Sequence, residues 1–247
     1  SYSWDHYGDL DPDESNDGPR PGALLRLLEH GLAMAGEFPA GPLLDIGCAV
    51  GRSAFALAER YERLVLGIDL NYALLRQAQR VLREGRVRYP RRRVGVVYDR
   101  RDFPVSWKHM QLVDFWACDA AALPFEDRRF AAATGMNLLD CVPSPWDLLN
   151  SLATALQTGG AAVLACPYDW SSSATPLEGW LGGHSQRSPE AGASEAMLRR
   201  LLTAGQPQAI PGLRLEAEDE HEWQVRLHDR SVVAYQSHLV VARREGE

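Results

Sequence analysis

The sequence predicts an α/β domain with a mostly parallel sheet, helices on both faces of that sheet, and an antiparallel edge. Three observations lead to this prediction. Short runs of β-forming residues alternate with amphipathic helical segments through most of the 247-residue chain. A glycine-containing turn joins the first predicted strand to the helix that follows it. The chain closes with two predicted strands that have little helical sequence between them, as expected of an antiparallel edge.

The predicted elements follow in order along the chain. Residues 1–21 are polar and contain several Asp, Gly and Pro residues, so we expect an N-terminal arm or loop there and not a core element. Leucines at helical spacing predict a helix over residues 22–35. Strands are expected at residues 43–47, 64–68, 112–118, 130–136, 161–166, 213–225 and 232–241. The remaining helices are expected at residues 52–61, 73–83, 146–156 and 194–202.

Composition and charge exclude several classes of protein. Hydrophobic residues make up 45% and charged residues 24% of the chain, as in ordinary globular proteins. We expect a single domain over residues 1–247, because that length suffices to bury one large core. No apolar run reaches the roughly 18 residues that a membrane-spanning helix needs, so we expect no membrane partner. The net charge of −7 argues against a general attraction to nucleic acid.

The cysteines predict neither disulfides nor a metal site. Cys48, Cys118, Cys141 and Cys166 form no Cys-x-x-Cys pair, and each lies in or beside an apolar run. We therefore expect buried free thiols and a cytoplasmic protein. No cluster of His and Cys has the spacing of zinc ligands. The first residue is Ser1 and no signal-peptide pattern follows, which indicates a processed chain or a piece of a longer protein with a further domain.

Two stretches interrupt the alternation of strands and helices. Residues 85–111 form an arginine-rich insert, and residues 167–192 form a loop rich in Ser, Gly and Trp that follows a strand end. Long loops in a compact α/β domain are more often functional than not. The valines of the insert predict a strand with charged edges that faces solvent or a partner. The alternative is that Arg91–Arg93, beside Tyr89 and Tyr98, binds phosphate or RNA.

The most informative segment runs from Leu44 to Ser53, with the sequence Leu-Asp-Ile-Gly-Cys-Ala-Val-Gly-Arg-Ser. Gly47 permits a tight turn between strand and helix, and Gly51 permits close approach of the backbone to a ligand. The next predicted strand ends at Asp69, and in such folds a carboxylate at that place accepts hydrogen bonds from two ribose hydroxyls. The alternative for Asp69 is a helix N-cap. The Gly-x-x-x-Gly spacing differs from that of a dinucleotide site.

This pattern resembles motif I of the class I S-adenosylmethionine (SAM)-dependent methyltransferases, and the resemblance extends over roughly residues 40–166. It implies a Rossmann-like class I methyltransferase fold, SAM as the cofactor and S-adenosylhomocysteine as the product. The cofactor residues it implies are Asp45 near the methionine ammonium, Gly47, Cys48, Ala49 and Gly51 around the methionine and ribose, Asp69 on the ribose, Leu70, Asp119 and Ala120 around the adenine, and Asn137 where sulfonium and acceptor meet.

A second resemblance concerns the methyl acceptor. The chain resembles the thiohistidine N-methyltransferase domains of ovothiol biosynthesis at Gly47–Ser53, Pro167–Trp170, Thr175–Pro176 and Trp180–Gly183. This resemblance implies methyl transfer to a nitrogen of a small histidine- or thiohistidine-like compound. The chain departs from the family pattern in its arginine-rich insert, in its closing strands and at Asp169, where the family has threonine.

Two peripheral segments are expected to surround the acceptor. The residues expected to bind it are Tyr7, Asn137, Trp170 and Trp180. The two tryptophans would close over a flat ring and exclude water; the alternative is that they anchor the loop 167–192 to the core. The candidate catalytic residues, which would orient the acceptor or take up its proton, are Asp140, Tyr168, Asp169 and His184.

Two other functions stay open on the sequence alone. One is methyl transfer to RNA or protein through the arginine-rich insert. The other is a non-catalytic subunit that has the fold of a SAM-dependent enzyme and stabilises or recruits a partner protein. The absence of an Asn-Pro-Pro-Tyr sequence after the fourth strand argues against methylation of amides or nucleobase amines.

Overall fold

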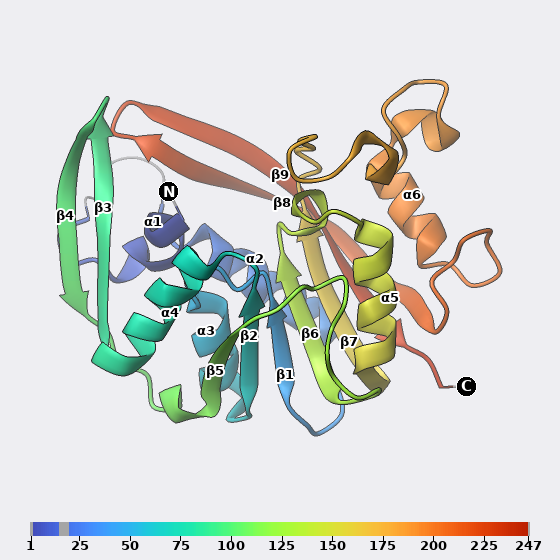
Figure 1. Cartoon of the computed structure of the whole chain (residues 1–247), viewed down its shortest axis with the longest axis horizontal. Helices are drawn as coiled ribbons and strands as arrows, with labels where there is room; N and C mark the ends of the chain where they lie inside the picture. The colour runs from blue at the N-terminus through green and yellow to red at the C-terminus, as the bar shows by residue number, and fades with distance from the viewer. Residues whose placement is uncertain (1, 15–19, 247) are drawn as a thin grey trace.

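A seven-stranded sheet forms the centre of the protein (Figure 1), as seen in a computed structural model that describes residues 2–14 and 20–246. Its strands are β1 (Leu43–Ile46), β2 (Val65–Asp69), β5 (Val113–Ala117), β6 (Phe130–Met136), β7 (Leu156–Cys166), β8 (Leu213–His228) and β9 (Ser231–Arg244). They are arranged in the order β5-β2-β1-β6-β7-β9-β8. The first five strands in this order are parallel, whereas β9 runs antiparallel to both β7 and β8. The predicted fold class is confirmed.

Helices cover both faces of this sheet because neighbouring residues of each buried strand point to opposite sides. Leu43 packs in the core beside the first group of helices, whereas Leu44 and Ile46 pack in the core on the other side. The first group consists of α2 (Ala23–Ala35), α3 (Arg52–Tyr61) and α4 (Tyr72–Glu84). The second group consists of α5 (Pro145–Ala155) and α6 (Ser194–Leu201). This alternation explains why the central strands read as continuous apolar runs in the sequence.

The N-terminal segment differs from the predicted arm. Residues Tyr2–Tyr7 form the helix α1, followed by a short 3-10 turn at Gly8–Leu10. Trp4 and Tyr7 are 3% and 1% exposed and belong to the same core cluster as α2. The prediction of a loop without a core role is therefore wrong for these residues, because two aromatic side chains three positions apart supply a buried helix face. Ser1 and residues 15–19 of the predicted arm lie outside the described residues.

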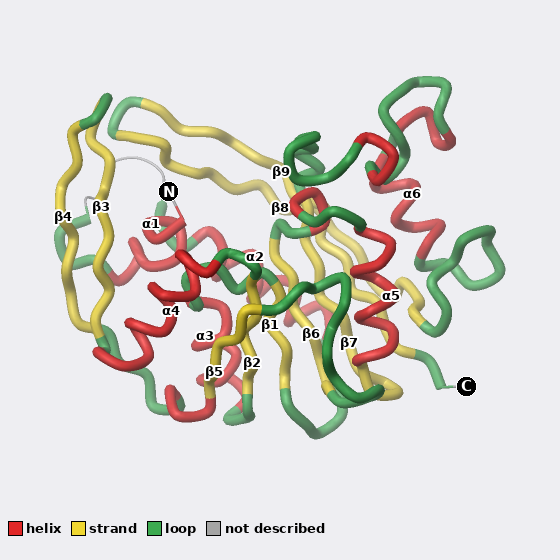
Figure 2. The backbone as a smooth tube through the Cα atoms, viewed as in Figure 1, coloured by secondary structure: helices red, strands yellow, loops and turns green. Residues whose placement is uncertain are grey.

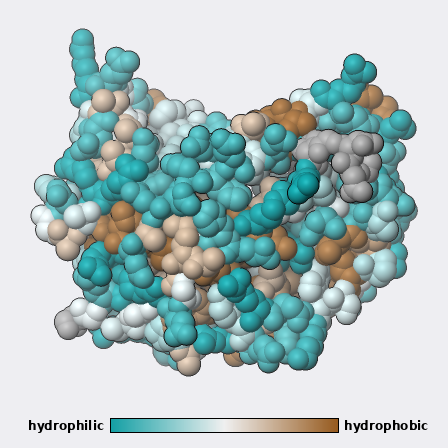
Figure 3. All heavy atoms as spheres, turned by 180° about the vertical axis from the view of Figure 1, so that it is seen from behind, coloured by the Kyte–Doolittle hydropathy of each residue, from teal (hydrophilic) through white to brown (hydrophobic). Residues whose placement is uncertain are grey.

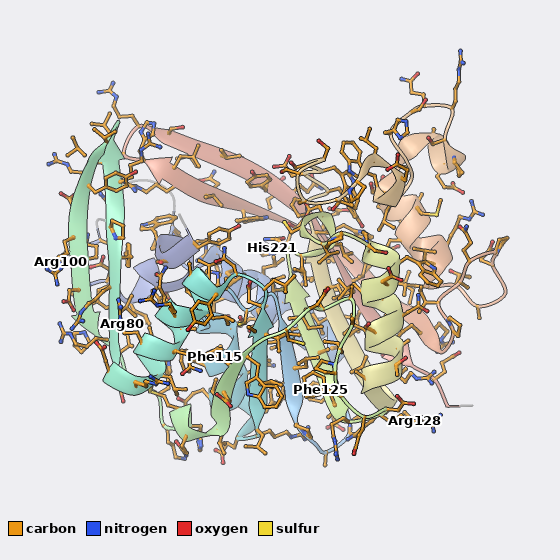
Figure 4. The ribbon with its side chains drawn as sticks, in the orientation of Figure 1. Arg80, Arg100, Phe115, Phe125, Arg128 and His221 are labelled. Carbon is orange, nitrogen blue, oxygen red and sulfur yellow. The ribbon has the colours of Figure 1, made fainter. Side chains whose placement is uncertain are left out.

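The arginine-rich insert is a two-stranded antiparallel hairpin of β3 (Arg86–Val94) and β4 (Val97–Pro104). Its strand character is as predicted, and Val96 at the turn is 92% exposed. Most of its arginines pair with carboxylates of the same chain, whereas Arg92 donates to the carbonyl of Gly95. The pairs are Arg86 and Arg88 with Asp102, Arg91 with Glu14, Arg93 with Asp99, and Arg101 with Asp11. Arg100 extends from the outer strand of the hairpin (Figure 4), and its side chain is 80% exposed.

The β8–β9 hairpin extends well beyond the rest of the sheet (Figure 2). Only residues 238–243 of β9 pair with β7, and the preceding residues pair with β8 alone. The end of the hairpin reaches the β3–β4 hairpin, where Arg226 donates a 2.8 Å hydrogen bond to the carbonyl of Arg92 and the amide of Asp229 donates one of 2.9 Å to the carbonyl of Arg93. The extended β8–β9 hairpin thus forms an arch whose far end is fixed.

On the face seen in Figure 3, hydrophilic residues predominate and hydrophobic residues form small separate areas. None of the helices in the described parts of the chain is long and apolar enough to cross a membrane.

Cys48 and Cys166 are buried, Cys118 is partly exposed and Cys141 is exposed. The prediction of buried thiols is therefore correct for only two of the four, because Cys118 and Cys141 follow strand ends where the core stops.

Candidate functional site

A cavity of about 560 Å³ lies at the carboxyl ends of β1, β2 and β6. Open α/β sheets bind their ligands at this edge, and this volume lies within the usual range for small-molecule sites. The residues here termed the cofactor half are Asp45, Gly47, Ala49, Asp69, Leu70, Asp119, Ala120 and Asn137. The residues here termed the acceptor half are Tyr2, Asp5, His6, Leu24, Asp140, Asp169, Trp223, Val225, Leu227 and Tyr235. Eight of the ten residues expected to bind the cofactor line the cavity, whereas in the acceptor half only Asp140 and Asp169 were expected.

The turn after β1 needs glycine at two places for different reasons. Gly47 has φ +66°, and a Cβ there would lie 2.7 Å from Cδ1 of Leu138. Gly51 has φ +89°, and a Cβ there would lie 2.6 Å from Cζ of Phe115, which extends from β5 (Figure 4). Gly51 therefore allows the turn to pack against β5, and it is absent from the cavity lining, in contrast to the prediction. Cys48, 1% exposed, is likewise absent from the cavity lining.

Asp69 is the last residue of β2, and it forms part of the cavity lining. Its Oδ2 accepts a 2.9 Å hydrogen bond from the Ala49 amide, and its Oδ1 accepts one of 2.6 Å from the Asn71 amide. Each carboxylate oxygen has a further lone pair that can accept from a ribose hydroxyl. The N-cap of α4 is Asn71, whose Oδ1 accepts from the Ala73 amide. The N-cap interpretation of Asp69 is therefore wrong, and two backbone N–H groups orient its carboxylate.

The adenine end of the cofactor half lies beside Asp69. Leu70 is 63% exposed although it lines the cavity, so its apolar side chain is available to a flat ring. Asp119 follows β5, and its Oδ1 accepts a 2.9 Å hydrogen bond from the Ala121 amide. This contact leaves the other oxygen, Oδ2, for an exocyclic amine. The arrangement fits an adenosine.

Asp45 supplies a buried carboxyl at the other end of the cofactor half. It is 2% exposed, and it accepts hydrogen bonds of 2.5 Å from Oγ of Ser53 and 2.8 Å from Oγ1 of Thr134. Burial raises the pKa of Asp45 to about 6, although the two hydroxyl groups oppose this shift. A nearby cation would favour its charged form, so Asp45 fits the ammonium group of a methionine moiety.

The β8–β9 hairpin supplies an aromatic wall to the acceptor half. Trp223 and Tyr235 face each other across the two strands and stack with their ring centroids 5.1 Å apart. The indole of Trp223 donates to Oγ of Ser237, which in turn donates a 2.8 Å hydrogen bond to Oδ1 of Asn137. This network holds Asn137, at φ +54°, between the two halves. Sequence reasoning missed this wall, and the only available signal was the alternation of Trp223, Val225 and Leu227 along one strand face.

Two carboxyl groups meet at the ends of β6 and β7. Asp140 is 3% exposed, and its Oδ2 accepts a 2.7 Å hydrogen bond from the Asp169 amide. Burial raises the pKa of Asp140 above its ordinary value. The Asp169 carboxylate accepts a 3.1 Å hydrogen bond from the hydroxyl of Tyr235. The structure thus brings together the two predicted candidate residues that can accept a proton or an N–H group of an acceptor.

Other predicted acceptor residues lie away from the cavity lining. Tyr168 is partly buried and its hydroxyl lies 2.8 Å from Nδ1 of His238, whereas His184 is exposed on the surface. Tyr7 is buried and donates a 2.6 Å hydrogen bond to the carbonyl of Val50. The structure therefore does not place these three residues where they were predicted, at the acceptor. Tyr168 and Tyr7 are held by packing in the core, and His184 lies on the outer part of its loop.

The two tryptophans of the loop 167–192 anchor that loop. Trp170 and Trp180 stack on each other with centroids 5.9 Å apart. Trp170 donates to Oγ of Ser194, and Trp180 donates to the carbonyl of Thr175. Neither lines the cavity. Of the two interpretations of these tryptophans, the geometry favours anchoring of the loop over closure on the acceptor.

Neither a thiol nucleophile nor a metal centre is formed. Cys141 lines the cavity, and although the residue is exposed overall, partial burial of its sulfur and the neighbouring Asp140 raise the pKa of its thiol to about 12, so its thiolate is disfavoured. Among the described residues, no group of His, Cys, Asp and Glu has the arrangement of a metal site. The side chains that line the cavity include carboxyl groups and aromatic rings.

Comparison with known proteins agrees with the fold and the cofactor half. Residues 44–164 match the methyltransferase domain family. Tocopherol O-methyltransferase, chloroplastic, of Arabidopsis thaliana is 23% identical over 186 residues, which cover 71% of this chain and 47% of that protein. Trans-aconitate 2-methyltransferase of Sinorhizobium fredii is 28% identical over 137 residues, which cover 55% of this chain and 42% of that protein. The chain thus spans less than half the length of these relatives.

Solved structures share the fold at low sequence identity. A SAM-dependent methyltransferase from Methanosarcina mazei has a TM-score of 0.54 at 21% identity, covering 83% of this chain and 93% of that one. The cyclase SpnF has a TM-score of 0.59 at 16% identity, covering 96% of this chain and 87% of that one. The second likeness illustrates that this fold by itself does not fix the reaction.

The family match, the sheet topology and the cofactor half together define a class I SAM-dependent methyltransferase domain. Its cofactor is SAM. The cavity fits this cofactor because its lining carries three carboxyl groups that can accept hydrogen bonds from the cofactor's donors. Asp69 would accept from the ribose hydroxyls, Asp119 from the adenine amine and Asp45 from the methionine ammonium.

Proposed function

We propose that this chain is an enzyme that transfers the methyl group of SAM to a nitrogen of a small imidazole compound of the histidine or thiohistidine type. One observation carries the proposal: a wall of Trp223 and Tyr235 stands beside the carboxyl groups of Asp140 and Asp169 in one cavity. Flat rings stack on such a wall, and carboxylates accept N–H groups. A flat nitrogen-containing acceptor suits both features.

The reaction requires alignment more than acid–base chemistry. SAM supplies an electrophilic methyl group on a sulfonium, and the acceptor nitrogen must present its lone pair in line with that bond. Orientation of this kind accounts for up to roughly 7–11 kcal/mol of barrier lowering in favourable systems. Asn137 lies between the two halves, where it would fix the position of the reacting atoms. Asp140 and Asp169 would accept the remaining N–H of the ring and so set its tautomer.

The charge of the cavity supports a small neutral or cationic acceptor. Six aspartates line the cavity: Asp5, Asp45, Asp69, Asp119, Asp140 and Asp169. Among the described residues that line it, none is Lys or Arg. Two relatives, a tocopherol and a trans-aconitate methyltransferase, are named for small acceptors, which also supports a small acceptor here. An acidic cavity of this kind does not attract a phosphate backbone.

RNA as the substrate receives no support from the arginine-rich hairpin. Arg86, Arg88 and Arg100 share Asp102, and Arg91, Arg93 and Arg101 pair with Glu14, Asp99 and Asp11, so much of the positive charge of the hairpin is offset within the chain. The hairpin instead holds the end of the β8–β9 arch through Arg226. We infer that its role is to position the cavity wall.

A methyl-transfer screen with mass detection tests the proposed function. The purified chain and SAM are incubated with histidine, other imidazoles, thiols, other amino acids and bulk RNA. The expected product is an imidazole 14 mass units heavier, by the gain of one methyl for one hydrogen, with one S-adenosylhomocysteine formed per methyl group. Transfer only to thiols or RNA would contradict the proposed acceptor. Tight SAM binding without transfer to any acceptor would favour the alternative of a non-catalytic subunit.

A further inference from the structure

The helix α1 leaves two buried polar atoms without a hydrogen-bond partner. They are Oδ1 of Asp5 and Nδ1 of His6. The two residues are 7% and 4% exposed, and both line the cavity. Tyr2, also in the lining, lies three and four positions before them, so the three side chains share one face of the helix. One short helix therefore presents three polar side chains to the same cavity.

Such unpaired atoms call for a partner. Buried polar groups in native proteins are almost always hydrogen-bonded, and an unpaired one destabilises the folded chain. Other carboxyls of the cavity have partners in the chain: Asp45 accepts from two hydroxyl groups and Asp69 from two amides. The contrast indicates that Asp5 and His6 are paired by a ligand.

The chemistry of the two groups selects an N–H donor. Burial lowers the pKa of His6 to about 3, and the positive charge of the nearby Arg52 acts in the same direction. The ring is therefore neutral, and Nδ1 can accept a hydrogen bond. Burial raises the pKa of Asp5 to about 7. The positive charge of Arg26 lowers this pKa, and the negative charge of Asp9 raises it. A cationic donor would favour ionised Asp5. None of the described lining residues offers the cation that an acidic ligand group would need.

The position of α1 in the chain assigns it to the acceptor and not to the cofactor. The family match covers residues 44–164, which supply every residue of the cofactor half. Tyr2, Asp5 and His6 precede this segment, as Trp223 and Tyr235 follow it. Class I domains share their cofactor segment and differ in what surrounds the acceptor. The carboxylates that SAM needs are already present in the cofactor half.

We propose that Asp5 and His6 bind an ammonium or N–H donor group of the methyl acceptor. This inference rests on the proposed function and deepens it, because it adds a second recognition point to the ring-binding wall of Trp223 and Tyr235. The acceptor would then be a flat ring with an attached cationic or N–H donor group. Tyr2 would lie over the pair on the same helix face.

Binding to the complex with S-adenosylhomocysteine tests this inference without turnover. Histamine, histidine and imidazole acetate are titrated calorimetrically into the preformed complex of the wild type and of the variants Asp5→Asn and His6→Leu. The Asp13→Asn variant is the matched control, because Asp13 belongs to the same N-terminal segment, its side chain is 79% exposed, and it lies outside the cavity lining. Thermal unfolding of each variant checks that it is folded.

We expect the wild type to bind the two amines at least tenfold more tightly than imidazole acetate. Asp5→Asn and His6→Leu should each weaken histamine at least tenfold, with the affinity for S-adenosylhomocysteine changed less than twofold. Equal affinity for imidazole acetate, no binding of any probe, or variants that weaken only the cofactor product would each overturn the inference. If the wild type binds the amines as expected and transfers no methyl group, the proposed function fails while Asp5 and His6 remain assigned as an amine-binding site.

Discussion

The cofactor half and the acceptor half of the cavity differ in how their polar groups are satisfied. Asp45 and Asp69 each accept two hydrogen bonds from the surrounding chain, so these carboxylates are held in place before any ligand arrives. Asp5 and His6 have one buried atom each without a partner. Groups that are held in place before binding suit a ligand that is always the same, such as the cofactor. Unpaired buried groups gain most binding free energy from a ligand that supplies their missing hydrogen bonds.

The two halves also differ in where their residues come from. The cofactor half is contributed by one continuous segment, which matches the methyltransferase domain family. The acceptor half combines α1 with the β8–β9 hairpin, near the two ends of the chain, and the segments after β6 and β7. The difference teaches that this fold can keep its cofactor chemistry while its ends adapt to a new acceptor.

The largest effect is expected in the cofactor half. Asp69→Ala removes the carboxylate that we propose accepts from the ribose hydroxyls, and hydrogen bonds to a charged group contribute about 1.5–3 kcal/mol each. We expect SAM affinity to fall by at least about 100-fold, as measured by calorimetry. Asp114→Ala is the control, since Asp114 is an exposed acid on the neighbouring strand β5 and lies outside the cavity lining. An unchanged SAM affinity for Asp69→Ala would remove the distinction between the two halves.

The unpaired carboxyl of Asp5 predicts a pH-dependent stability. Burial raises its pKa to about 7, so the folded chain keeps a proton that the unfolded chain has released. The stabilising contribution is present in full below about pH 4 and is lost as the pH rises through about 7. Between pH 5 and pH 8 the wild type should lose about 2–3 kcal/mol more free energy of unfolding than Asp5→Asn. Denaturant unfolding at both pH values measures this, and parallel losses in the two proteins would refute it.

The aromatic wall predicts an intermediate effect that is confined to the acceptor half. Trp223→Ala removes a stacking surface, and aromatic pairs contribute about 0.5–1.5 kcal/mol beyond their buried area. We expect the acceptor KM to rise about tenfold, while the affinity for SAM stays within about twofold. The matched control is Trp116→Ala, because Trp116 is 49% exposed and outside the cavity lining. A loss of SAM affinity equal to the loss of acceptor affinity would show that the two halves are not separate.

The smallest effect is expected at Cys141. Its thiol lines the cavity, but its pKa of about 12 makes a thiolate nucleophile unfavourable. Cys141→Ser should change kcat by less than about twofold, because methyl transfer from SAM needs no covalent enzyme intermediate. A large loss of kcat, or trapping of a methylated thiol in mass spectra, would mean that the acceptor half works by covalent chemistry.

The fold and the cofactor half could be predicted from the sequence because their signals are local. Each buried strand is a short apolar run, and the turn at Gly47 and the acid at Asp69 lie at fixed places relative to two successive strands. Gly51 shows the limit of this reasoning. Its residue type was correctly expected to matter, but the reason is contact with Phe115, whose approach depends on the packing of β5.

The acceptor half could not be predicted because it depends on long-range packing. Trp170 and Trp180 look like a lid in the sequence, yet they stack on each other and hydrogen-bond to their own loop. Trp223 enters the cavity only because β8 and β9 extend beyond β7, which depends on strand register. The helix α1 is six residues long and therefore too short for a periodic pattern to identify.

A crystal structure with S-adenosylhomocysteine is the most direct test of the division of this cavity. We predict that the ribose hydroxyls lie within hydrogen-bond distance of Asp69, and that the sulfur faces Asn137 and the space bounded by Trp223, Asp140 and α1. A product molecule with its adenosine against Trp223 and Tyr235, or with Asp5 and His6 bonded to its amino-acid end, would contradict the account.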